Sequence, residues 1–230
     1  MSDVPVPPPP PPPLPAVPPG GPSGGEPRVD IGAAISYGWS KTTQYFGSWV
    51  VVVLVLLLVQ VALYVIARPF SDNLFMSLLV SALSIVVGFV VALGVYRLAL
   101  AVTAGEKPSV GELFKTDNLG DYVVAAILAG LAVGIGYILC ILPGLILAVL
   151  LGFFAYFVLD KNAGAIDSLK ASWDLSLQNF WGLVGLYIVM LLINFLGALL
   201  CGVGLLLTIP LTWTAHAYVY RTLVGETPAP

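Results

Sequence analysis

Long runs of apolar residues dominate the chain from residue 48 onward, and they constrain its fold more than any other feature. A bilayer core about 30 Å thick needs around 20 helical residues to cross it. The runs predict six membrane-spanning helices, at Ser48–Ala67, Leu74–Tyr96, Tyr122–Leu142, Leu145–Leu159, Trp181–Leu200 and Val203–Tyr220. Hydrophobic residues make up 59% of the chain and charged residues only 9%, too few to cover a water-soluble globule. We therefore expect an all-α integral membrane protein in contact with the lipid bilayer.

Two of the reversals between the expected spans are very short. Pro143-Gly144 separates the third span from the fourth, and Gly202-Val203-Gly204 separates the fifth from the sixth. Such residues mark tight turns. Because the fourth span is short for a bilayer, re-entrant hairpins that return to the side they left are an alternative to full crossings.

The basic residues predict the orientation. With six spans, Arg68 alone falls on one side; the other eight fall on the opposite side, namely Arg28, Lys41, Arg97, Lys107, Lys115, Lys161, Lys170 and Arg221. Basic residues concentrate in cytoplasmic loops, so both termini are expected in the cytoplasm. The N-terminus lacks a basic leader followed by an apolar core, and no cleaved signal peptide is expected.

Residues 1–27 form a separate segment that precedes the membrane domain. It contains seven consecutive prolines, Pro7–Pro13, followed by a Gly/Pro/Ser stretch, and such tracts favour polyproline II and bury no core. We expect a disordered cytoplasmic spacer; the alternative is a ligand for a cytoplasmic partner with an aromatic groove. The membrane domain is expected over 28–225, with a short tail at 226–230.

A polar phrase that begins with tryptophan occurs twice, each time just before an apolar run. The copies are WSKTTQYFG at 39–47 and WDLSLQNFW at 173–181, and they align without gaps. Apolar residues recur along one helical stripe of each copy, at Ile31, Ile35, Trp39 and Phe46 and at Ile166, Leu169, Trp173, Leu177 and Phe180. This pattern is typical of a helix that lies in the membrane interface. We expect Trp39, Trp173 and Trp181 to act as interfacial anchors.

The chain also repeats on a larger scale. A third short amphipathic segment follows Ser109, whose spacing to Glu112 is that of a capping box. The second and sixth spans are followed by GEKP at 105–108 and by GETP at 225–228. These echoes predict three units, each an interfacial helix followed by two spans. Because each unit crosses the bilayer an even number of times, the three interfacial helices are expected on one face.

The same residues resemble a known family. Tyr37-Gly38-Trp39 leading to Tyr45-Phe46-Gly47, and DKNAGAIDSLKASWDLSLQNFW after an ILPG turn, look like bacterial inner-membrane proteins of the YciC type. They are also similar to the membrane domain fused to some glycerophosphodiester phosphodiesterases. The match covers roughly residues 30–225, and the proline-rich leader resembles actinobacterial members. The resemblance implies a polytopic helical fold and a bacterial plasma-membrane location rather than a function.

Phosphodiesterase chemistry is not expected of this chain. Metal-dependent hydrolysis uses clustered carboxylates and histidines, whereas His216 is the only histidine and Asp72 the only acidic residue outside the tails and cytoplasmic loops. We therefore expect no enzyme, no metal site and no cofactor. The net charge is −3 and no basic cluster occurs, so no nucleic-acid partner is expected.

A few polar and small residues within the spans have predicted roles. Asn194, Thr212 and His216 form a candidate polar pocket, either along a solute path or at a lipid headgroup; the alternative, which we favour, is hydrogen bonding between helices. Ala126, Gly130 and Gly134 repeat every four residues and predict a seam where helices pack closely.

Two cysteines lie at the outer ends of expected spans. Cys140 and Cys201 each follow a glycine by four residues, and we expect two reduced, packed thiols rather than a disulfide. They are too few for a disulfide framework or a zinc site.

Two classes of function are compatible with these features. The first is a non-enzymatic scaffold or accessory factor for a membrane complex or envelope process, with a membrane-protein partner or a second copy; we favour it because no span carries a buried charge. The second is a transporter or channel for a lipid or a small neutral solute, since internal repeats are common in transporters.

Overall fold

All regular secondary structure in the described part of the chain is helical, and that part contains no strand. The computed structural model describes residues 28–70, 73–200 and 202–230, so the expected disordered segment 1–27 lies outside them. The α-helices are α1 (Ile31–Gln44), α2 (Phe46–Ala67), α3 (Leu74–Thr103), α4 (Leu119–Leu139), α5 (Ile141–Leu150), α6 (Phe154–Lys161), α7 (Ala165–Gln178), α8 (Phe180–Leu199) and α9 (Leu205–Leu223). Short 3-10 helices occur at η1 (Arg68–Phe70) and η2 (Val110–Phe114). The predicted all-α class is confirmed.

Five helical segments of the described residues are long and apolar enough to cross a membrane. They are Phe46–Ala67, Leu74–Thr103, Leu119–Leu139, Phe180–Leu199 and Ile141–Lys161, the last of which joins α5 to α6. They correspond to the first five expected spans. The sixth, Val203–Tyr220, falls on α9, which is not among them. Pro210, His216, Arg221 and several threonines lower the hydropathy of α9, which leaves it outside the group of helices that length and composition alone identify as spans.

The break between the third and fourth expected spans lies earlier than predicted. The helical chain is interrupted at Cys140, which is extended, and α5 begins at Ile141. Pro143 and Gly144, expected to form the turn, lie instead in the first turn of α5. Proline is tolerated there because the first amide groups of a helix have no partner within the helix.

The two predicted amphipathic helices match each other closely. Helices α1 and α7 each contain 14 residues, and each is followed after one residue by a long apolar helix, α2 or α8. Their buried residues form pairs that are all 134 residues apart: Ala34 and Ser168, Gly38 and Ser172, Lys41 and Leu175, Thr42 and Ser176. Both helices therefore bury the same face, which is small or polar at most positions.

Part of each predicted apolar stripe points the other way, although Ile31 and Ile35 of α1 are half-buried against the main core. Trp39 is 54% exposed, and on α7 Ile166, Trp173 and Leu177 are exposed as well. An exposed apolar stripe opposite a buried face of small residues suits a helix whose outer side meets lipid.

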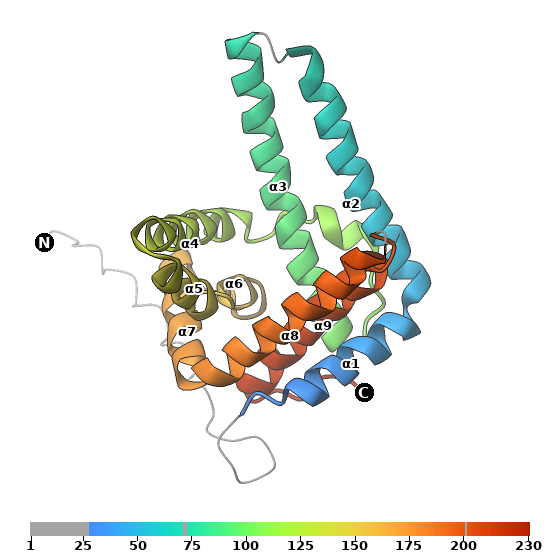
Figure 1. Cartoon of the computed structure of the whole chain (residues 1–230), viewed down its shortest axis with the longest axis vertical. Helices are drawn as coiled ribbons and strands as arrows, with labels where there is room; N and C mark the ends of the chain where they lie inside the picture. The colour runs from blue at the N-terminus through green and yellow to red at the C-terminus, as the bar shows by residue number, and fades with distance from the viewer. Residues whose placement is uncertain (1–27, 71–72, 201) are drawn as a thin grey trace, which may run out of the picture.

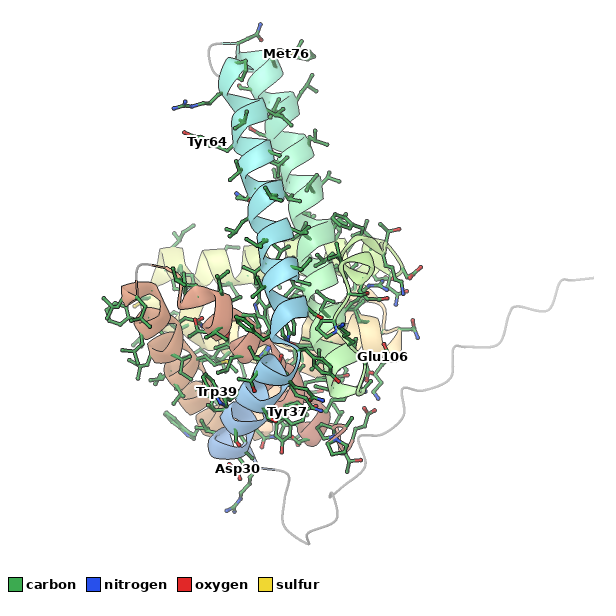
Figure 2. All side chains as sticks on the ribbon, turned by 90° about the vertical axis from the view of Figure 1, so that its right-hand side faces the viewer. Asp30, Tyr37, Trp39, Tyr64, Met76 and Glu106 are labelled. Carbon is green, nitrogen blue, oxygen red and sulfur yellow. The ribbon has the colours of Figure 1, made fainter. Side chains whose placement is uncertain are left out.

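The helices are arranged around a core to which α9 contributes many buried residues. The hairpin of α2 and α3 projects from the rest of the protein, while α4 runs across the direction of α3 (Figure 1). Met76 and Tyr64 lie near the far end of this hairpin, and Asp30, Trp39 and Glu106 lie at the opposite end of the molecule (Figure 2). Large apolar side chains are exposed along most of the hairpin, as lipid contact requires.

A cluster of charged side chains joins the ends of α6 and α9. Asp160 accepts from Lys161 at 3.0 Å and from Arg221 at 2.7 Å, and the same two cations pair with Glu226. The hydroxyl of Tyr220 also donates to Asp160, at 3.1 Å. These contacts hold the last turn of α9 against α6.

Candidate functional site

A pocket of about 640 Å³ lies between α3, the α5–α6 segment, α8 and α9. Its lining is mainly apolar but includes tyrosines, an amide, a hydroxyl and an imidazole. The lining residues are Ala92, Val95, Tyr96, Ala99, Ala148, Gly152, Tyr156, Tyr187, Met190, Leu191, Asn194, Thr212, Trp213 and His216. Mostly apolar concave sites of this size with a few converging polar groups are typical of small-molecule sites.

The imidazole of His216 is held between two tyrosine hydroxyls. Its Nε2 lies 2.8 Å from the hydroxyl oxygen of Tyr187 on α8, and its Nδ1 lies 3.3 Å from that of Tyr156 on α6. The ring also stacks on Phe153, with centroids 4.6 Å apart. A neutral imidazole has one donor and one acceptor nitrogen, and a hydroxyl can play either role, so both contacts are satisfied in either tautomer.

Asn194 and Thr212 form a second polar pair at the pocket. The Asn194 side-chain Nδ2 donates to the Met190 carbonyl at 3.0 Å and to Thr212 Oγ1 at 3.3 Å. The Thr212 hydroxyl donates to the Ile209 carbonyl at 2.9 Å. Asn194 Oδ1 is buried and has no hydrogen-bond donor within the described part of the chain.

The three polar residues predicted to form a pocket are therefore brought together. Asn194, Thr212 and His216 all line the same cavity, and the hydrogen bond between Asn194 and Thr212 also links α8 to α9, as the alternative interpretation expected. That the pocket binds a solute or lipid stays a prediction.

Sequence reasoning missed the tyrosines and the glycine that shape this site. Tyr96, Tyr156 and His216 are spaced 60 residues apart and all line the pocket, a regularity visible in the sequence. Gly152 leaves room for Tyr187, because a Cβ at this position would lie 2.1 Å from the Tyr187 hydroxyl and would displace it. This contact joins distant segments, so no local pattern could have predicted it.

The small residues of the seam predicted on α4 differ in their surroundings: Ala126 packs against a buried cluster, whereas Gly130 and Gly134 do not lie at a close contact between described helices. No described atom lies within 4 Å of a Cβ built on Gly130 or Gly134. The close approach occurs instead at Gly136, whose Cβ would lie 2.9 Å from the Gly144 Cα on α5. The four-residue spacing identified a row of small residues, but the buried row is a neighbouring one, Tyr122, Ala125, Ala129 and Gly136.

The three tryptophans predicted as interfacial anchors and the described cysteine are all exposed, to different extents. Trp39 is 54% exposed, Trp173 is 39% exposed and Trp181 is 83% exposed, which leaves their headgroup location a prediction. Cys140 is free and exposed rather than packed, and Cys201 lies outside the described residues. The described residues contain no group of three His, Cys, Asp or Glu side chains close enough to hold a metal ion.

Comparison with known proteins relates the chain to mycobacterial proteins. It is 34% identical over 132 residues to the uncharacterized protein Rv2560 of Mycobacterium tuberculosis and to the uncharacterized protein Mb2590 of Mycobacterium bovis. The aligned region is 57% of this chain and 41% of each relative, so the chain spans less than half of their length. No solved structure matches. The family model of a domain of unknown function, DUF7847, matches residues 71–226, which contain all the helices that line the pocket, and the chain belongs to this family.

Proposed function

We propose that this chain is a non-enzymatic, multi-pass protein of the bacterial plasma membrane that binds a lipid or a small neutral solute in the pocket between α3, α6, α8 and α9. The observation that carries the proposal is the convergence of Asn194, Thr212 and His216 on one mainly apolar cavity. This moves the transporter-like function ahead of the scaffold favoured from the sequence. The scaffold stays the second candidate because of the proline run at Pro7–Pro13.

The orientation in the membrane is part of this proposal. Arg68 lies beside the tip of the α2–α3 hairpin, whereas Lys41, Lys161 and Arg221 lie near the C-terminal segment that follows α9. This separation supports cytoplasmic termini. Both termini share a side only with an even number of crossings, so this orientation requires that α9 returns the chain to the side on which α8 begins. Reporter fusions at both termini test it, and periplasmic activity at either terminus would exclude it.

The resemblance to YciC-like proteins and to phosphodiesterase-linked membrane domains also belongs to this proposal. The mycobacterial relatives support the part of it that pointed to actinobacteria.

We also propose that the three-unit repeat underlies the pocket. The paired buried positions of α1 and α7 support equivalence of the first and third units. Positions 60 residues apart on α3, the α5–α6 segment and α9 line the pocket in two layers: Ala92, Gly152 and Thr212 in one, and Tyr96, Tyr156 and His216 in the other. Each unit would thus contribute its last helix to a shared central cavity.

Contacts between the units support the same arrangement. Gly38 of α1 meets α9 at Leu211 and Ala215. Gly94 of α3 meets Leu113 of η2. Ser172 of α7 meets the end of α5 and the residues after it. In each case the short helix of one unit packs against the second span-like segment of another, which is α9, α3 or the α5–α6 segment.

A matched pair of variants tests the pocket. Ala92→Phe places a large ring in the cavity, while Ala82→Phe places the same ring on an exposed position of the same helix, α3. Native mass spectrometry of protein extracted from its own membrane should find a lipid or solute retained by the wild type and Ala82→Phe but lost from Ala92→Phe. Equal retention by both variants would contradict the proposal.

A further inference from the structure

The side chains that line the pocket distinguish between charged and uncharged ligands. Its lining includes no Asp, Glu, Lys or Arg among the described residues. An ionised group buried without a counter-charge is strongly disfavoured, so a charged headgroup would not be stabilised there. We therefore expect any group bound inside the pocket to be uncharged.

Among the fully buried side-chain polar atoms of the lining, one acceptor has no partner within the described residues. Both amide hydrogens of Asn194 are used, by Met190 and Thr212. The Thr212 hydroxyl hydrogen is used by Ile209, and the His216 nitrogens face Tyr156 and Tyr187. Asn194 Oδ1 is buried without a donor among the described residues. Because buried polar atoms in native proteins are nearly always paired, the missing partner is an O–H or N–H donor.

The remaining lining shows where the rest of the ligand would lie. Ala92, Val95, Ala99 and Met190 present an apolar wall around the polar groups. Leu191 also lines the pocket and is 69% exposed, so the pocket reaches the outer, apolar surface of α8. A ligand with a hydroxyl inside and hydrocarbon chains outside would fit both parts.

We propose that the pocket takes a neutral lipid with a free hydroxyl, of the diacylglycerol class, which donates its hydroxyl hydrogen to Asn194 Oδ1 while its acyl chains extend past Leu191 into the bilayer. This inference rests on the proposed function and specifies its ligand. Trioleoylglycerol, which lacks the hydroxyl, leaves the acceptor unpaired. Phosphatidic acid, which replaces the hydroxyl with a charged phosphate, places that charge where no cation compensates it.

The test uses the full chain in phosphatidylcholine nanodiscs that contain equal amounts of dioleoylglycerol, trioleoylglycerol and dioleoylphosphatidic acid. Native mass spectrometry measures which of them stays bound after release from the disc. The wild type should retain dioleoylglycerol at least about tenfold over each of the other two, as expected for one buried hydrogen bond.

Two variants locate the effect. Asn194→Leu should reduce the retention of dioleoylglycerol about tenfold, to that of trioleoylglycerol. Gln60→Leu, which replaces an exposed amide on α2, serves as the matched control and should retain the wild-type preference. The wild-type comparison of the three lipids decides the question even where Asn194→Leu does not fold.

The outcomes separate the inference from the proposed function. Equal retention of dioleoylglycerol and trioleoylglycerol, with both displaced by Ala92→Phe, would overturn the hydroxyl inference and leave a lipid pocket in place. Preference for phosphatidic acid would overturn it as well. Retention of no lipid above the Ala92→Phe background would overturn both.

Discussion

Residues 31–108 and 165–228, the proposed first and third repeat units, share the same order of helices but stabilise it with different side-chain contacts. Helices α1 and α7 have equal length and bury equivalent faces. Yet Gly38 on α1 lets the helix approach the backbone of α9, whereas Ser172 at the paired position of α7 forms hydrogen bonds to the last residue of α5 and to the residue before α6. The same contact is thus made by close approach in one unit and by a hydroxyl bridge in the other.

The ends of the two units show the same contrast. After α3, Gly105 adopts φ 87° and the Glu106 amide donates to the Ala101 carbonyl; after α9, Gly225 adopts φ 81° and the Glu226 amide donates to the Arg221 carbonyl. The backbone conformation and the hydrogen bond that end α3 and α9 are therefore the same. The side chains differ, because Glu226 pairs with two cations while Glu106 forms no ion pair within the described residues.

The largest effect is expected at Gly38. A Cβ at this position would lie 2.6 Å from the Leu211 carbonyl oxygen and 3.2 Å from the Ala215 Cβ. Gly38→Leu should lower the free energy of unfolding by about 3 kcal/mol or more, since α1 would have to separate from α9. The control is Gly47→Leu, where no described atom lies within 4 Å of a Cβ. Denaturation of both variants in mixed micelles measures the effect, and equal stability would show that α1 does not pack as described.

The next effect is expected at Ser172, the paired position on α7. Its hydroxyl donates to the Leu150 carbonyl at 2.9 Å and accepts from the Phe153 amide at 3.0 Å. Ser172→Ala leaves both buried groups unpaired and should cost about 2 kcal/mol.

Ser176 offers a control on the same buried face of α7. Its hydroxyl has no partner in the described chain, so Ser176→Ala should be neutral or slightly stabilising in the same denaturation experiment. A larger loss from Ser176→Ala than from Ser172→Ala would mean that the hydroxyl bridge does not hold α7 in place.

The comparison also shows which features could be predicted from the sequence. The repeated phrase before two apolar runs predicted α1 and α7, because a tryptophan-containing amphipathic pattern is local information. Asn194, Thr212 and His216 could be grouped because polar residues in apolar helices normally face the interior.

What sequence reasoning missed depends on contacts between distant segments. Nothing local distinguishes Gly130, which contacts no other helix in the described chain, from Gly136, which packs against α5. The same holds for the α5–α6 link, where Gly152 leaves room for the Tyr187 hydroxyl and Ser172 accepts from Phe153. The apolar runs likewise did not indicate that α9, which carries threonines and a histidine, would be largely buried.

A smaller effect is expected at the glycines that end the two units. Gly105→Ala and Gly225→Ala place a side chain at positive φ, which costs about 1 kcal/mol each. Gly105→Ala should be the more destabilising of the two, because its Cβ would lie 3.1 Å from the Ala229 Cβ.

Gly130→Ala in the interior of α4 should instead raise the free energy of unfolding, since it removes backbone freedom from the unfolded chain without creating a close contact. A destabilising Gly130→Ala would instead indicate that α4 packs against another molecule at the originally predicted seam.

The smallest effect is expected at Glu226, and it should depend on pH. Burial alone would raise the pKa of Glu226, but hydrogen bonds from Lys161 and Arg221 and their positive charges outweigh burial and lower it. A carboxyl whose pKa is lower in the folded state contributes stability above its unfolded pKa, about 4.3, and loses that contribution as pH falls through the folded pKa.

Glu226→Gln should therefore lower the melting temperature slightly at pH 6 to 7, as expected for a partly exposed ion pair worth about 1 kcal/mol or less. The difference in melting temperature from the wild type should shrink below about pH 4. Glu106→Gln, at the matching position of the first unit, should show neither the loss nor the pH dependence. A difference that persists unchanged at pH 3.5 would show that Glu226 acts through its shape or hydrogen bonds, and that the two ends differ less in charge pairing than the structure indicates.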